Sequence, residues 1–212
     1  MTTITIGSIT YNLVALPHSI APVEVEFGMT DAIAVVQSPY APGQFQTQQW
    51  PGADLWDMTV TMPPLSDAIA ADWEGFLAEL RGMLNVFQMG DPRRKTPLGP
   101  ALGVPVCSAG NLTSATSLIT GGWAPSTARI LKRGDMLQVG YRLHKVCENV
   151  SSDGSGNCTI PIWPSLREGP PTSTPVILHN PVGLWRLADN RRQSQASKLR
   201  LGSLSFRAIE AR

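Results

Sequence analysis

The segment from Leu55 to Met62 constrains the fold more than any other part of the chain. From Trp56 onward apolar and polar residues alternate strictly, and this period of two predicts a strand with one buried face. The predicted buried face consists of Trp56, Met58, Val60 and Met62. Pro63-Pro64 cannot continue a hydrogen-bonded ladder, so we expect the strand to end there.

One amphipathic helix is predicted over 67–81, directly after this strand. Apolar residues recur there at the spacing of a single helix face: Ile69, Trp73, Phe76, Leu77 and Leu80. Ser66 or Asp67 can cap the first turn, and Gly82 stands where a left-handed C-terminal residue is expected. With about four turns, the helix is expected to cover a sheet. A further strand is predicted over 83–89.

The rest of the chain is typical of short strands joined by many turns. Its 18 prolines and 19 glycines follow no period. Hydrophobic residues make up 42%, which argues against disorder. Charged residues make up only 16%, against about 25% in an average protein. We therefore expect a mainly β protein with one α-helix, part of whose surface is covered by other protein.

Two segments in the first sixty residues have a distinct character. Residues 32–36 form a short apolar run before Ser38-Pro39. Residues 43–52 are rich in glutamine and predict a polar hairpin tip or arm.

A second β region is predicted between residues 93 and 182. It opens with a loop rich in proline and glycine, and Gly140-Tyr141 lies between two strand patterns as a tight hairpin turn. The sequence Asp153–Asn157 is a strong turn signal before a strand at 158–163, and Pro161 predicts that this strand is an edge or carries a bulge. These features predict a small β-barrel or sandwich.

The C-terminus returns to a strand pattern. Leu204, Phe206 and Ala208 share one face, whereas Leu199 and Leu201 are out of phase with them, which predicts a bulge at 202–203. We expect this late strand to pair with the N-terminal strands. Residues 1–92 and 183–212 would then form one β-sandwich-like domain, with 93–182 inserted as a second domain.

Charge is divided along the chain. Residues 1–90 hold nine acidic residues and one basic residue, whereas residues 91–212 hold seven acidic and sixteen basic residues. Opposite halves can attract each other within the fold or between copies set head to tail, or they can form two solvated faces. The candidate inter-subunit contacts are Arg93, Arg94, Lys95, Arg191 and Arg192. Two short basic clusters without a stacking motif are a weak nucleic-acid footprint, so sequence-specific nucleic-acid binding is not expected.

The sequence carries no pattern that predicts catalysis. His18, His144 and His179 lack metal-ligand spacing, and phosphate-binding, dinucleotide-binding and nucleophile-elbow motifs are absent. Three cysteines are an odd number for a disulfide framework, so we expect reduced thiols, with one pair meeting across strands as the alternative. No apolar run of about 18 residues could span a bilayer. We expect a protein that is not an enzyme, is made in the cytoplasm and uses no metal or cofactor.

Tryptophans supply the remaining candidate binding residues. Trp50, Trp123, Trp163 and Trp185 each lie beside proline, glycine or arginine, as interface anchors or sugar-stacking platforms do. Half-buried packing is the alternative for each of them.

The order of these features resembles that of the distal tail proteins of long-tailed, non-contractile bacteriophages. The resemblance covers most of residues 55–190. It is carried by the strand at 56–62 with Pro63-Pro64, the helix at 67–81, the run Phe87–Pro92, the run Leu131–Gly140 with His144–Val146, and the turn Asp153–Asn157 leading to Ile162-Trp163-Pro164.

The resemblance implies a structural protein of the virion tail, formed in the host cytoplasm as a ring of six copies. Its belt domain would join the tail tube protein to the hub and tip proteins. A carbohydrate-binding module in 93–182, serving host-surface adhesion, is the alternative and is compatible with the ring. A hydrolase is the third hypothesis, and oligomeric mass separates the ring from the other two.

Overall fold

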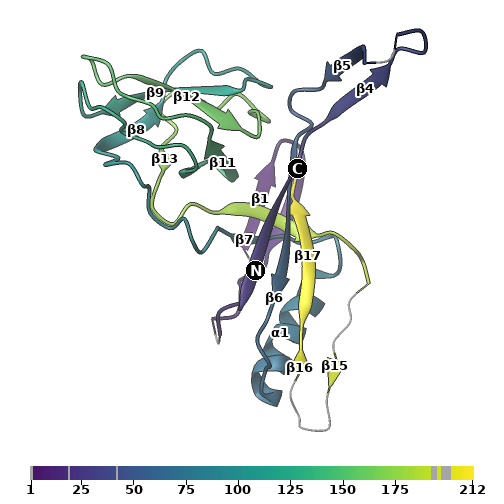
Figure 1. Ribbon diagram of the computed structural model, residues 1–212. Coiled ribbons are helices and arrows are strands. Elements are labelled where there is room, and N and C mark those ends of the chain that lie inside the picture. The colour runs from purple at the N-terminus through teal and green to yellow at the C-terminus, as the bar shows by residue number, and fades with distance from the viewer. Residues whose placement is uncertain (1, 19, 42, 192–194, 197–201) are drawn as a thin grey trace. The chain divides into compact units, whose positions relative to one another are not determined.

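The computed structural model is mainly β, with one α-helix among the residues it describes, and this confirms the predicted fold class (Figure 1). The structure describes residues 2–18, 20–41, 43–191, 195–196 and 202–212. The chain forms two compact units. The first contains 1–28, 56–93 and 182–212, and the second contains 29–55 and 94–181. The predicted insertion, 93–182, nearly coincides with the larger segment of the second unit, 94–181. The sequence did not predict that residues 29–55 also belong to that unit.

A five-stranded sheet forms the centre of the first unit. Its strand order is β3 (Glu24–Thr30), β6 (Leu55–Thr61), β17 (Ser205–Glu210), β14 (Gly183–Leu187) and β7 (Phe87–Met89). The C-terminal strand β17 lies in the middle and pairs antiparallel with both β6 and β14. It therefore completes the N-terminal sheet, as the sequence predicts. Residues 199 and 201, where the sequence predicts a change of phase, lie outside the described residues.

Helix α1 (Asp67–Leu80) covers one face of this sheet. The alternation of β6 is as predicted, since Trp56, Met58 and Val60 are buried, as is Met62 directly after the strand. Trp73 and Phe76 of the helix pack on Phe206 of β17, with ring centroids 6.3 and 6.4 Å away. Phe76 also meets Phe87 of β7 edge to face at 5.5 Å. Aromatic burial of this kind is the main source of stability in the unit.

The ends of α1 differ in detail from the prediction. Ser66 is the N-cap, but its side chain makes no capping hydrogen bond, and Arg81 is the left-handed residue that ends the helix, with Gly82 also left-handed. The predicted strand at 83–89 is wrong in its first half, because the chain turns there and β7 begins at Phe87. Asn85 stabilises this turn, since its side-chain amide donates to the carbonyl of Glu79 at 2.8 Å.

An N-terminal hairpin packs elsewhere on the same unit. Its strands are β1 (Thr2–Ile6) and β2 (Ile9–Leu13). Ile4, Ile6 and Tyr11 form a buried cluster with Val86 and Leu184. Because Leu184 precedes Trp185 in β14, this cluster lies on the face of the sheet opposite to Trp185. A short pair, β15 (Gln195–Ala196) with β16 (Gly202–Ser203), precedes β17.

A six-stranded sheet curls into a nearly closed barrel in the second unit. Its order is β13 (Val176–Ile177), β10 (Met136–Val139), β11 (Arg142–Val146), β12 (Cys158–Trp163), β9 (Ser117–Trp123) and β8 (Gly103–Cys107). The two ends approach each other, because the Cys107 N–H donates to the carbonyl of Thr174 and the Ser173 N–H to that of Cys107, each at 2.8 Å. The interior is an apolar core, and burial raises the pKa of the Cys107 thiol to about 11.

The predicted turns of this barrel and the strand at 158–163 are confirmed, but this strand is not at an edge, and its described pairings show no bulge. β10 and β11 form the hairpin around Gly140-Tyr141. Backbone N–H groups of Asn157 and Ser155 donate to Asp153 and lower its pKa. The strand with Pro161 is interior, between β9 and β11, instead of an edge. Proline is tolerated because it lies where the pairing with β9 ends and the pairing with β11 begins.

Candidate functional site

A two-stranded hairpin of the second unit is the candidate site. It consists of β4 (Ile33–Gln37) and β5 (Phe45–Gln49), which pair antiparallel over five residues each. We call these two strands and the turn between them the arm. No third strand pairs with either one among the residues that the structure describes, as Figure 1 shows. Both outer edges therefore present backbone groups without a strand partner.

Local chemistry explains why the chain reverses at the tip of the arm. The hydroxyl oxygen of Ser38 accepts hydrogen bonds from the backbone N–H groups of Tyr40 and Ala41. The Ser38 N–H in turn donates to the carbonyl of Gln44 at 3.0 Å. Gly43 supplies the left-handed backbone conformation that the turn requires, at a φ of 94°.

Apolar side chains of the arm are exposed to solvent. Cross-strand pairing places Ile33, Val35 and Phe45 on one face, and these side chains are 48%, 58% and 60% exposed. Val36 is exposed on the opposite face, beside Gln46, and Tyr40 at the tip is 95% exposed. An isolated hairpin is at best marginally stable in water, and exposed apolar patches mark interaction sites.

The arm also carries no charge. Residues 32–53 include no Asp, Glu, Lys, Arg or His, and the flanking charged residues are Asp31 and Asp54. Charged side chains are the usual protection of a free strand edge against pairing with another chain. An uncharged edge with an apolar face fits a neutral protein surface and does not fit a phosphate, a cation or a nucleic acid.

Sequence reasoning identified an arm but mistook its character. The glutamines of 43–52 predict a polar tip, whereas the structure pairs them with the apolar run of β4. The signal that was overlooked is the absence of charge over 32–53. An apolar strand of a monomeric protein is buried by a partner element, and no such element covers this one among the described residues.

The four candidate tryptophans occupy different environments, and Trp185 is buried in the core of the first unit. Trp123 is buried in the core of the barrel and donates its indole N–H to the hydroxyl of Thr120 at 2.8 Å, so neither ring face is free for a sugar. Trp163 is half-buried and donates to the carboxylate of Asp31 at 2.6 Å. Trp50, at the end of the arm, is exposed.

The basic candidates that the structure describes differ in their exposure and contacts. Arg93 is exposed and forms an ion pair with Asp91 of the same chain at 3.1 Å, which raises its pKa. Arg94 is half-buried, and Lys95 and Arg191 are exposed. Arg192 lies outside the described residues.

Folding largely cancels the division of charge along the chain. By composition, the first unit has ten acidic and nine basic residues, a net charge of −1. The second has six acidic and eight basic residues, a net charge of +2. The C-terminal basic residues share a unit with the acidic N-terminal segment, and Arg207 approaches Asp57 at 3.8 Å there. The acidic and basic halves of the sequence therefore do not correspond to an acidic and a basic unit of the fold.

Comparison with known proteins gives no family for this chain, since neither a protein-family model nor a curated protein matches it. The described residues contain no group of three or more His, Cys, Asp or Glu side chains that could hold a metal ion. Within the same ranges, no helix is long and apolar enough to cross a membrane.

Proposed function

We propose that this protein is a structural, self-associating subunit whose arm docks on a neighbouring copy. The exposed, uncharged arm is the observation that supports this function. A hairpin with an apolar face and two open edges gains stability when it is covered. In line with the resemblance of the sequence to distal tail proteins, the assembly we propose is a closed ring of a phage tail, between the tail tube and the proteins of the tip.

A second copy is the occupant we propose for the arm, because each copy also carries a neutral apolar surface of its own. Leu102, directly before β8, and Val104, in β8, are 53% and 79% exposed. Both precede Val106 and Cys107, through which this end strand meets residues 173–175. We call Leu102 and Val104 the β8 patch. An arm that covers the β8 patch of the next copy makes a heterologous contact, and such contacts form a ring when the rotation from copy to copy closes.

Substitutions on one face of the arm test this function. Ile33→Thr, Val35→Thr and Phe45→Thr together remove apolar surface but keep residues that favour strands. Gln46→Thr with Gln48→Thr changes the other face and is the matched control. By size-exclusion chromatography with light scattering, we expect the wild type and the control at several times the 22.8 kDa monomer mass, and the triple variant as a monomer.

Mixing two defective variants tests the heterologous geometry. A β8-patch variant, Leu102→Thr with Val104→Thr, is also expected to be monomeric. A mixture of this variant with the arm variant retains one intact contact per pair, so we expect heterodimers and no larger species. A monomeric wild type, or a triple arm variant of unchanged mass, would refute the proposed function.

A further inference from the structure

Both ends of the arm meet the same short segment of the barrel, residues 163–168. At the first end, the indole N–H of Trp163 donates to Asp31 at 2.6 Å. At the other end, the Gly52 N–H donates to the hydroxyl of Ser165 at 2.6 Å, and that hydroxyl donates to the Asp54 carboxylate at 2.9 Å. Two chain positions more than twenty residues apart are thus fixed by one segment.

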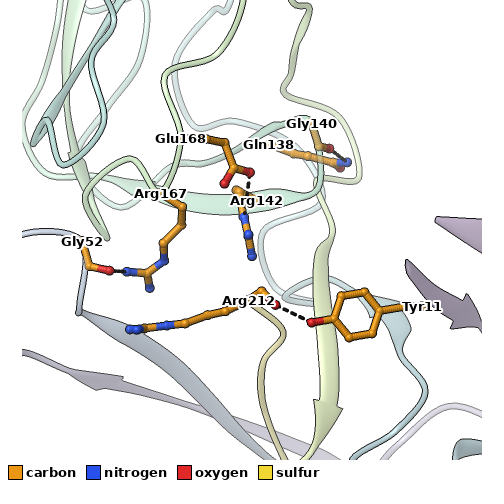
Figure 2. A network of polar contacts seen from close by, with 8 residues as sticks. All are labelled: Tyr11, Gly52, Gln138, Gly140, Arg142, Arg167, Glu168 and Arg212. Atoms are coloured by element: carbon orange, nitrogen blue, oxygen red, sulfur yellow. Dashed lines mark hydrogen bonds and ion pairs between the residues drawn. The ribbon is translucent and has the colours of Figure 1, made fainter. Parts of the chain in front are cut away.

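Arg167 adds the most extensive of these contacts. Its guanidinium donates to the backbone carbonyls of both Gly52 and Asp54, and Figure 2 shows the bond to Gly52. The planar fork of arginine suits two acceptors at a fixed separation, which a lysine ammonium cannot match.

Burial makes these polar contacts important to the structure. Asp54 and Ser165 are only 2% and 1% exposed. A buried polar group that loses its partner cannot turn to water instead, so opening the contact is unfavourable. Gly52 fits closely as well, because a Cβ atom there would lie 2.9 Å from the hydroxyl oxygen of Ser114.

The segment itself is held firmly by the barrel. His144 makes a hydrogen bond through Nδ1 with the carbonyl of Pro164 at 2.8 Å. Leu166 is buried in the core and exchanges backbone hydrogen bonds with residues 114–115 at 2.7 and 2.8 Å. The buried side chain of Arg142 pairs with Glu168 at 3.2 Å, also drawn in Figure 2.

We propose that residues 163–168 are a clamp that fixes the base of the arm, so that the barrel determines the direction in which the arm is presented. The inference rests on the proposed function, because the direction of the arm matters only if the arm docks. It deepens that function by giving the barrel a role in assembly. A pre-oriented arm loses less conformational freedom on binding than a loose one.

Two clamp variants and one matched control test this inference. Arg167→Lys retains the positive charge but loses the fork, and Trp163→Phe retains an aromatic ring but loses the donor to Asp31. Arg133→Lys is the control, because Arg133 also donates from its guanidinium to a backbone carbonyl, that of Cys147, elsewhere on the barrel. All three proteins are studied as full-length chains.

The first measurement is hydrogen–deuterium exchange of peptides from 29–33 and 50–55 in monomeric protein. We expect the clamp variants to exchange at least about tenfold faster there, with β9 and β12 unchanged, and the control to match the wild type. Unchanged exchange at the base of the arm in both clamp variants would overturn the clamp.

The second measurement is the association constant by light scattering. We expect the clamp variants to associate severalfold more weakly than the wild type. The control should associate as tightly as the wild type. Faster exchange with unchanged association would overturn the role of the clamp in assembly, yet leave the proposed function intact. If the arm-face variant also associates normally, the proposed function itself fails, and the exchange data still decide whether the clamp exists.

Discussion

The strands β4 and β6 have similar side chains but opposite surroundings. In β6, every second residue is apolar and buried beneath α1, and Met58 and Val60 are fully inaccessible to solvent. In β4, Ile33, Val35 and Val36 are equally apolar, yet all three are exposed. Apolar character thus shows that a strand needs a cover, but not whether the same chain provides it. For β6 the cover is α1, and for β4 we propose a second copy.

The largest expected effect is on the unfolding free energy, and it distinguishes the five-stranded sheet covered by α1 from the arm. Trp73→Ala removes the indole that packs on Phe206 and should lower the unfolding free energy by about 3–5 kcal/mol. Val35→Ala in the arm should change it by about 0.5 kcal/mol or less. Chemical denaturation of both variants, at concentrations where the protein is monomeric, measures the difference. Similar losses for the two variants would mean that the arm is part of a folded core.

Two glycine substitutions compare the base of the arm with its tip. Gly52 and Gly43 are both left-handed, with φ of 86° and 94°, so alanine strains the backbone at each position by about 1–2 kcal/mol. Only at Gly52 would the new Cβ also meet another side chain, that of Ser114. Thermal unfolding should therefore show a greater loss for Gly52→Ala than for Gly43→Ala. Equal losses would indicate that the base of the arm yields as readily as its tip.

The sequence was informative where one local pattern determines the structure. The period of two in 55–62, the helix face from Ile69 to Leu80 and the turns at 140–141 and 153–157 each specify an element by themselves. The prediction of an edge strand from Pro161 is wrong. Whether an interior strand accepts a proline depends on its register with both neighbouring strands, which no local pattern reveals.

The candidate site was harder to predict because it depends on contacts distant in sequence. The glutamines of β5 hid the apolar face that forms only when β5 pairs with β4. The clamp joins Asp31 and Asp54 to residues 163–167, more than one hundred positions away. The division of charge left several arrangements open, and only the return of β17 to β6, which brings basic residues beside acidic ones in the same unit, favours attraction within the fold.

Removal of the barrel tests whether the covered sheet is independent of it. Met89 and Gly183 are cross-strand partners in β7 and β14, so a short Gly/Ser linker in place of 94–181 can close a hairpin between them. We expect the first unit to remain folded by circular dichroism. Its unfolding free energy should change by less than about 1 kcal/mol, a shift of at most about 4–8 °C in melting temperature. An unfolded product would show that the sheet depends on the barrel.

The smallest expected effect concerns Arg94 and Lys95, the first two residues of the second unit's larger segment. Arg94→Glu with Lys95→Glu reverses two charges and leaves the Arg93–Asp91 ion pair intact. Exposed ion pairs contribute only about 0–1 kcal/mol each, so we expect slower association at low salt without loss of the assembled form. Screening shortens the Debye length to about 3 Å at 1 M salt, where the variant and the wild type should associate at the same rate. Stopped-flow light scattering at both salt concentrations measures this, with circular dichroism as the control for folding. A defect that persists at 1 M salt would mean that these side chains pack at the contact, and equal rates at low salt would place them away from it.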